Sequence, residues 1–272
     1  MNDAPPRPPE GDWLGTPYLR LEREGPVAVV TVDRPDMRNA MSPAMYFGVR
    51  YAVDLVNRDD TLAGLLITGS GDVFIPGGDL GGDNIDGWAD LPLLLSMDNT
   101  PFEAIRLSRK PVVCAVNGLA QGGGLMIAML ADVAVVSDRA TFRAPELFRG
   151  IADTNYGQIL PRQVGPARAR DMLMTGRVVT ADEAVDWGLV ARVVPHDELL
   201  AAAVEVLTWC CRTAPRARAD VKRTMDQFYG TYDRMAMDAS LSSDEPVEGF
   251  LAFKERRNPS WVPPELRGEG RI

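Results

Sequence analysis

Two glycine-containing turns have the residue types needed to bind an oxyanion. The segments FIPGGDL at 74–80 and NGLAQGGGL at 117–125 each follow an expected strand. Glycine has no Cβ, so the backbone N–H groups of such turns can approach a ligand closely. Two N–H groups aimed at one point form an oxyanion hole, and the dipole of a helix after the second turn would add positive potential. Taken singly, each turn is also explained by tight turning and close helix packing.

A phosphate loop is disfavoured, because the GxGxxG spacing and a following Lys-Ser or Lys-Thr pair are missing.

Alternating strands and helices up to about residue 195 place these turns at strand ends. The run at 112–116 is apolar throughout and indicates a strand buried on both faces, as parallel strands are. Ser42 followed by Pro43 has the form of an N-cap and first helical residue. Further strands are expected at 27–32, 62–69 and 133–137, and further helices at 101–107 and after the glycines 122–124. This order predicts an α/β core of repeated strand-strand-helix units.

The two ends of the chain differ from this core. Residues 1–17 contain five prolines and little apolar material, so we expect an extended arm outside the core. After residue 195 almost everything has helical periodicity, in the segments 198–211, 215–228 and 237–257. We therefore divide the chain into an arm at 1–17, a core at 18–195 and a helical region at 196–272 that caps the core or packs on a partner subunit.

Composition excludes several classes of protein. The 272 residues carry 29 basic and 38 acidic side chains, and the net charge of −9 disfavours a nucleic-acid binder. Cys114, Cys210 and Cys211 cannot all pair, which indicates a reduced, cytosolic chain. His196 is the one histidine, so a two-histidine metal site is impossible. No leader or membrane span is apparent, and we expect a cytoplasmic protein.

Six segments, in their order and spacing, resemble the crotonase superfamily, the enoyl-CoA hydratase/isomerase family. They cover about residues 18–261 and are DRPDMRNAMS at 33–42, FIPGGDL, KPVVCAVNGLAQGGG at 110–124, ATFRAPE at 140–146, TGRVVTADEAVDWGLVARVVP at 175–195 and EGFLAFKERRNPSW at 248–261. The resemblance implies a crotonase (ClpP-like) spiral with a C-terminal helical trimerisation region, assembled as a homotrimer or dimer of trimers. It also implies an acyl-CoA substrate, with coenzyme A as part of the substrate and with no separate cofactor and no metal.

The resemblance carries roles to particular positions. The two oxyanion donors fall on Gly78 and Gly123, and the acid/base falls on Glu146. Lys254 is the cation expected to bind the coenzyme A phosphates, in its own or a neighbouring subunit. The other cations at 212–223 and 256–257 are equally explained as solvated helix surface. The residues expected to border coenzyme A are Arg38, Ala40, Gly78, Asp79, Leu80 and Gly81.

Met126 is the departure from the family pattern. Hydratases of the family carry two glutamates, and Met126 stands where the first would be. Adding water needs one group to take a proton and another to supply one, whereas shifting a double bond needs a single base. Met126 together with Glu146 therefore favours enoyl-CoA double-bond isomerisation. The family resemblance implies that Met126 points into the acyl pocket, where its apolar side chain would raise the pKa of Glu146. Judged from the helix sequence alone, Met126 is a core residue.

Asp153 keeps other reactions open. It lies seven residues beyond Glu146, where it is either a second carboxylate or a helix N-cap. With Asp153 in the site, the alternatives are hydration and hydrolysis of a carbon-carbon bond in a β-dicarbonyl substrate. Asp98 and Glu103 are weaker candidate acids, better explained as solvated helix charges.

Two further classes are less favoured. A non-catalytic acyl-CoA-binding protein has no need of Glu146 in its pocket. A ClpP-like serine peptidase would need a catalytic histidine, and His196 has the setting of a surface cap just before a helix.

Overall fold

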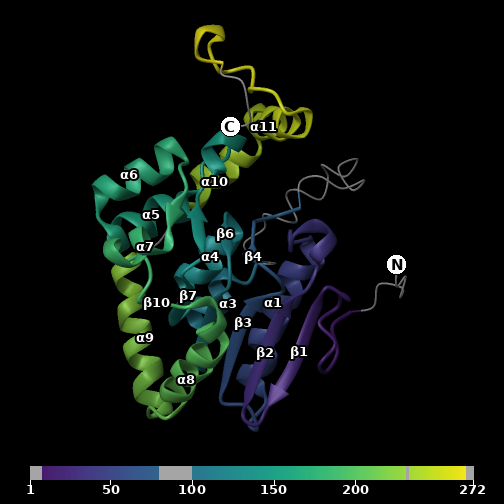
Figure 1. The fold of residues 1–272 in the computed structure, drawn as a ribbon, viewed down its shortest axis with the longest axis vertical. Coiled ribbons are helices and arrows are strands. Elements are labelled where there is room, and N and C mark those ends of the chain that lie inside the picture. Colours follow the sequence, from purple (N-terminus) through teal and green to yellow (C-terminus); the bar gives the residue numbers. More distant parts are fainter. Residues whose placement is uncertain (1–7, 80–99, 231–232, 268–272) are drawn as a thin grey trace.

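The computed structural model describes residues 8–79, 100–230 and 233–267, and its strands form two sheets (Figure 1). The larger sheet has six strands in the order β1-β2-β3-β5-β7-β10, in which β1 runs antiparallel to β2 and the others are parallel. Its strands are β1 (Leu19–Glu24), β2 (Val27–Val32), β3 (Gly64–Gly69), β5 (Val112–Val116), β7 (Val133–Ser137) and β10 (Arg192–Val194). The edge strand β1 was not predicted, because four of the six residues of its LRLERE sequence are charged.

A smaller sheet of four short strands carries the turns that matter for function. Its order is β4-β6-β8-β9, with β9 antiparallel to β8. Strand β5 leads to β6 and helix α4, and β7 leads to β8 and then α5, so the strand-strand-helix repeat is confirmed. The strands are β4 (Val73–Ile75), β6 (Leu119–Gln121), β8 (Thr141–Arg143) and β9 (Val179–Thr180).

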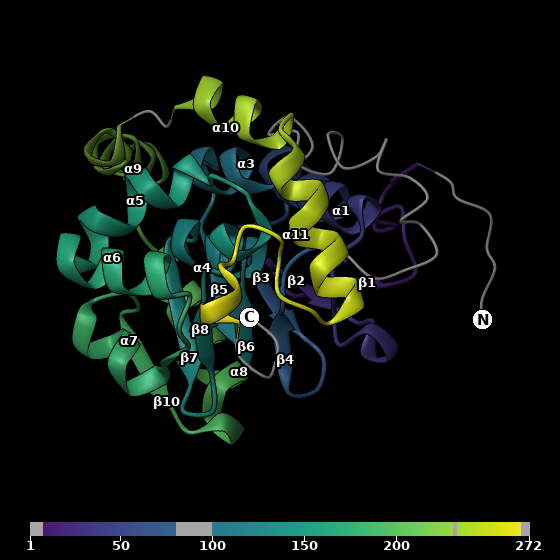
Figure 2. The same ribbon diagram turned by 90° about the horizontal axis from the view of Figure 1, so that it is seen from above.

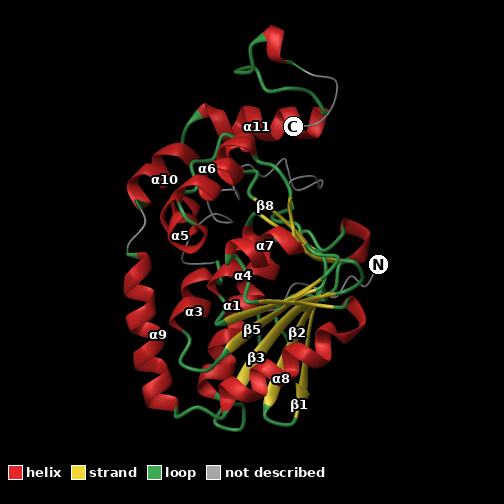
Figure 3. Ribbon diagram, turned by 60° about the vertical axis from the view of Figure 1, so that its left-hand side comes forward, coloured by secondary structure: helices red, strands yellow, loops and turns green. Residues whose placement is uncertain are grey.

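Both faces of the larger sheet are covered, as the apolar strands predicted. On β5, Cys114 packs in the main core while Val113 and Ala115 face a second apolar cluster. Helix α8 (Leu199–Cys211) closes that second cluster, and Figure 3 shows it on the opposite side of the sheet from α1, α3 and α4. These three helices span Pro43–Arg58, Phe102–Leu107 and Gly123–Leu130.

The last helices fold back over the core. Helix α9 (Pro215–Tyr229) runs along the molecule, and α10 (Arg234–Leu241) and α11 (Asp244–Glu255) lie across its upper end (Figures 1 and 2). The single helix expected at 237–257 is wrong, because the chain becomes extended at Ser243 and divides it in two. The remaining helices are α5 (Thr154–Val164), α6 (Pro166–Thr175) and α7 (Ala181–Trp187). None of the helices in the described ranges has the length and hydropathy of a membrane span.

The N-terminal arm also departs from expectation. Leu14 is fully buried in the main core, and its carbonyl oxygen packs against Gly48 of α1. Residues 1–17 therefore do not all lie outside the core, because one leucine among prolines and polar residues anchors the segment.

Two buried asparagines fix the chain between β3 and β4. Asn39 donates from Nδ2 to the carbonyl oxygens of Ser70 and Val73, at 2.9 and 2.7 Å, and accepts from the Arg34 N–H at 2.9 Å. Asn117 accepts from the Gly69 N–H at 3.1 Å and also donates to the Val73 carbonyl oxygen, at 3.3 Å. These amides replace sheet hydrogen bonds just before the first glycine turn, so the position of that turn depends on them.

We predict that Asn39→Ala lowers the free energy of unfolding by about 2–4 kcal/mol, measured by chemical denaturation. The variant removes the Asn39 donor from two carbonyl oxygens, of which that of Val73 keeps only the longer bond from Asn117, and it places alanine at a left-handed φ of +64°. Asp36→Ala, on the exposed surface of the short helix η1 (Pro35–Met37), is the control. A loss in Asn39→Ala no larger than in the control would refute this role.

Candidate active site

A cavity of about 380 Å³ lies between the two glycine turns and the C-terminal helices. Gly78 and Gly123 line one part of it, and Met237 of α10 and Phe250 of α11 line another. Its volume lies in the range of small-molecule sites. The cavity therefore brings together the two turns that the sequence singled out and two helices from the C-terminal region of the chain.

The first turn presents the Gly78 backbone to this cavity. The Met41 N–H donates to the Gly77 carbonyl oxygen, and the Asp79 N–H donates to the Met41 carbonyl oxygen, both at 2.9 Å. Because Met41 bonds to the residues on either side of Gly78, the Gly78 N–H points away from Met41. Gly77 has a φ of +107°, which glycine adopts without strain.

The second turn presents the Gly123 backbone. Gly123 is the first residue of α4, where a helical N–H has no partner within the helix. The Tyr46 hydroxyl lies so close to Gly123 that a Cβ there would overlap it, so only glycine fits this position. The preceding carbonyl oxygen, of Gly122, accepts from the Tyr156 hydroxyl at 2.6 Å, which holds the turn from the side of α5.

Glu146 supplies a carboxyl group to the same cavity. It opens the short helix η3 (Glu146–Arg149), and its Oε2 is buried with no hydrogen-bond partner among the described residues. Burial is the largest cause that raises the pKa of Glu146, to about 8, and the neighbouring Asp153 carboxyl is the second. A carboxyl in this state can both take and release a proton near neutral pH.

Asp153 is both a helix N-cap and a lining residue of the cavity. It caps helix α5, where its Oδ1 accepts from the N–H groups of Asn155 and Tyr156 at 2.9 and 3.3 Å. It also lines the cavity with Glu146. Burial raises the pKa of Asp153, and the capping hydrogen bonds oppose that rise. The helix cap thus places a second carboxyl beside Glu146.

The Met126 side chain does not lie in the cavity, where the family resemblance placed it. Its side chain is buried in the main core, and it is not among the described residues that line the cavity. Helix α4 enters the core directly, and every residue from 124 to 130 is buried. The expectation that Met126 points into the acyl pocket is therefore wrong; its backbone N–H instead donates to the Gly122 carbonyl oxygen at 3.0 Å.

The residues expected to border coenzyme A divide into three groups. Ala40 and Asp79 line the cavity, and Asp79 pairs with Arg34 at 2.7 Å. Arg38 is exposed and is not among the described lining residues. Lys254 is exposed on α11, the helix that also carries the lining residue Phe253. Leu80 and Gly81, together with the weaker candidate Asp98, lie outside the described residues.

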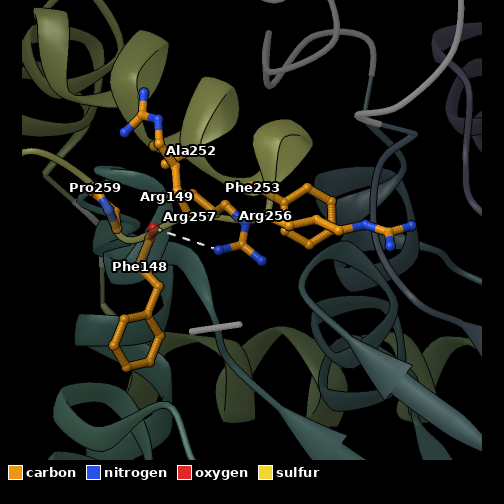
Figure 4. A pocket seen from close by; sticks show the side chains of 8 residues that line it. Phe148, Arg149, Ala252, Phe253, Arg256, Arg257 and Pro259 are labelled. Carbon is orange, nitrogen blue, oxygen red and sulfur yellow. Dashed lines mark hydrogen bonds between the residues drawn. The ribbon is translucent and has the colours of Figure 1, made fainter. Parts of the chain in front are cut away.

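Arg149 is a lining residue that the sequence did not reveal. Its guanidinium carbon lies 4.1 Å from the centroid of the Phe253 ring, so η3 and α11 meet at the cavity wall; Figure 4 shows both side chains from a small neighbouring pocket that they also line. Burial lowers the pKa of Arg149 to about 10, which leaves it charged at neutral pH. No local pattern marks Arg149 in PELFRG, because its burial depends on a helix a hundred residues further along the chain. Helix α11 covers the cavity of its own chain.

The remaining candidates have structural roles. Glu103 pairs with Arg106 at 2.9 Å on α3, as expected of a helix charge. His196 Nδ1 lies 3.0 Å from the Ser137 hydroxyl, and that serine is fully buried, which denies a substrate access to it. No group of three or more potential metal ligands occurs within the described ranges.

Comparisons with known proteins show the family and the fold of this chain. A family model described as enoyl-CoA hydratase/isomerase matches residues 22–264. A carnitinyl-CoA dehydratase from Salmonella arizonae is 36% identical over an alignment of 266 residues. The match covers 89% of this chain and 97% of that protein. The structure of an enoyl-CoA hydratase/isomerase from Pseudoalteromonas atlantica has a TM-score of 0.78 at 30% identity, covering 90% of this chain and 100% of that chain. The structure of a monofunctional enoyl-CoA isomerase from M. smegmatis has a TM-score of 0.67 at 29% identity, covering 84% of this chain and 100% of that chain. The fold is thus the crotonase spiral, and the chain belongs to the enoyl-CoA hydratase/isomerase family, whose enzymes act on acyl-CoA thioesters.

Proposed function

We propose that this enzyme shifts the double bond of an enoyl-CoA by proton transfer at Glu146. The observation that carries the proposal is the Glu146 Oε2, which has no hydrogen-bond partner among the described residues and belongs to a side chain lining the cavity of both glycine turns. A carboxylate oxygen that none of the described residues engages is available to a substrate proton.

The two turns stabilise the charge that proton removal creates. The thioester oxygen accepts hydrogen bonds from the Gly78 and Gly123 N–H groups, and the loss of one such donor costs about 3 kcal/mol. Glu146 removes a proton from the α-carbon of a β,γ-enoyl thioester to give a dienolate. The Glu146 carboxyl proton exchanges with solvent, and the acid then donates a proton to the γ-carbon, so that the double bond lies between the α- and β-carbons. This shift neither oxidises nor reduces the substrate, so the reaction needs no cofactor beyond its own coenzyme A.

Two features favour one base over two. Met126 packs in the core, so the position of the first family glutamate contributes no acid to the cavity. Asp153 engages one carboxyl oxygen with two backbone N–H groups, which leaves Glu146 as the less constrained carboxyl. In this account Asp153 is a positioning residue, which raises the proton affinity of Glu146 by its negative charge.

Hydration is the second candidate, favoured by the placement of Asp153 in the same cavity as Glu146. Two carboxyl groups can hold one water molecule, with one taking its proton and the other protonating the α-carbon. The name of the Salmonella relative, a carnitinyl-CoA dehydratase, describes the reverse of such a reaction.

We also propose the homotrimer or dimer of trimers that the family resemblance implies. In its support, helix α9 exposes Val221, Met225 and Phe228 at helical spacing, although these side chains are large and apolar.

The two carboxyl variants separate the candidate functions. We predict that Glu146→Gln lowers kcat for conversion of a β,γ-enoyl-CoA to its α,β isomer by roughly a hundred- to ten-thousand-fold. Asp153→Asn should retain activity within roughly tenfold, because Asn accepts the same capping hydrogen bonds while losing the charge. The absorbance of the α,β-unsaturated thioester measures both.

Two other outcomes would favour a different function. Water addition to an α,β-enoyl-CoA that both variants abolish would establish the hydratase. Binding of an acyl-CoA that neither variant changes, without turnover, would establish a binding protein.

The raised pKa of Glu146 makes a separate prediction about pH. Glu146 must be deprotonated to take the first proton, so kcat/KM should rise with pH through a limb near 8. Asp153→Asn removes a neighbouring negative charge, lowers the pKa of Glu146 and moves this limb to lower pH. Asp36→Asn, at an exposed acid that is not among the described lining residues, should leave the limb in place. A limb in the ordinary glutamate range, or one that does not move in Asp153→Asn, would contradict the assignment.

A further inference from the structure

A second cavity lies behind the two carboxyl groups. It has a volume of about 200 Å³ and lies between η3, the start of α5 and the end of α6. Glu146, Ile151 and Asp153 line both this cavity and the first. These three residues therefore form the wall that the two cavities share, and the reacting groups lie at the junction.

The lining of the second cavity is mostly apolar. Leu147, Leu173 and Met174 contribute aliphatic surface, and the Tyr156 ring adds to it because the hydroxyl is engaged by the Gly122 carbonyl oxygen. Leu147 is 42% exposed and Met174 is 67% exposed, so the cavity opens to the surface between them. A water molecule held in a cavity needs roughly two to four polar partners, and away from the wall that carries Glu146 and Asp153 the lining supplies few. The chemistry favours a hydrocarbon occupant.

We propose that the second cavity binds the distal part of a straight acyl chain, which makes medium- and long-chain enoyl-CoA thioesters the preferred substrates. The inference rests on the proposed function, which sets the order of groups along the substrate. The thioester oxygen lies at Gly78 and Gly123, and the carbons that exchange protons lie beside Glu146. The carbons beyond them then lie past Glu146 and Asp153, where the second cavity begins.

The shape of this cavity sets the expected selectivity. Each methylene that leaves water for an apolar site adds about fourfold to affinity. Ile151, which is buried in the shared wall, gives that wall an apolar surface, and the acyl chain would pass along it from the first cavity to the second. Because the far end opens to the surface, a longer chain extends outward and is not rejected by a closed end.

Gly157 offers a way to narrow the cavity from its exposed side. It lies in α5 and lines the cavity, and a Cβ built on it meets no atom within 4 Å. Its helical backbone accepts an ordinary side chain, so Gly157→Leu places an isobutyl group into space that is open. Ala167→Leu adds the same group to the exposed surface of α6, outside the described lining, and is the matched control.

The test measures binding of saturated hexanoyl-CoA and dodecanoyl-CoA by calorimetry, because neither ligand is turned over. We expect the native protein to bind dodecanoyl-CoA more tightly than hexanoyl-CoA. Gly157→Leu should weaken dodecanoyl-CoA by roughly tenfold or more and leave hexanoyl-CoA nearly unchanged. Ala167→Leu should change neither. Met174→Gln, at an exposed rim position that carries little folding risk, should weaken dodecanoyl-CoA alone.

Two results would overturn the proposal. One is equal affinity of the native protein for the two ligands, and the other is an unchanged affinity ratio in both Gly157→Leu and Met174→Gln. Because binding is measured without turnover, the outcome is separate from the proposed reaction. A chain-length preference that the variants abolish, in a protein that does not isomerise enoyl-CoA, would uphold this cavity and reject the proposed function.

Discussion

The site depends on a buried carboxyl group, Glu146, which has no ion pair among the described residues and one oxygen without a hydrogen bond, although the charges of Arg149 and Arg143 act to lower its pKa. Moving a charged carboxylate out of water is costly, and the protein usually responds by raising the pKa of the group. Glu146 is in this condition, and Asp153 strengthens it by placing a like charge nearby. A buried carboxylate without a partner lowers stability, and pairing it with a cation or replacing it by an apolar residue would raise stability. Its presence beside two turns with available N–H groups therefore indicates chemistry.

The elements around Glu146 constrain one another. Asp153 caps α5, and α5 carries the tyrosine, Tyr156, whose hydroxyl holds the Gly122 carbonyl oxygen. That carbonyl belongs to the turn whose next residue, Gly123, presents its N–H to the cavity. The acid, the cap and the oxyanion turn thus form one connected unit, and Asp153→Asn is informative because it changes the charge of this unit while preserving its cap.

Most of the spiral could be predicted because its signals are local. The apolar run 112–116, the Ser42-Pro43 cap and the glycine turns each specify their own backbone conformation. The rest depends on contacts between distant segments. The burial of Leu14, the stacking of Arg149 on Phe253 and the break at Ser243 follow from how the ends of the chain pack on the core. Met126 was misplaced for the same reason, because one position on an apolar helix does not reveal which neighbour it faces.

Isotope incorporation tests the central claim, proton transfer at Glu146, most directly. The enzyme is incubated in heavy water with an α,β-enoyl-CoA and with its β,γ isomer, and the thioesters are analysed by mass spectrometry. The account predicts deuterium in the enoyl thioesters without addition of water, and loss of this exchange in Glu146→Gln. A product whose mass has increased by one molecule of heavy water, or exchange that persists in Glu146→Gln, would contradict it.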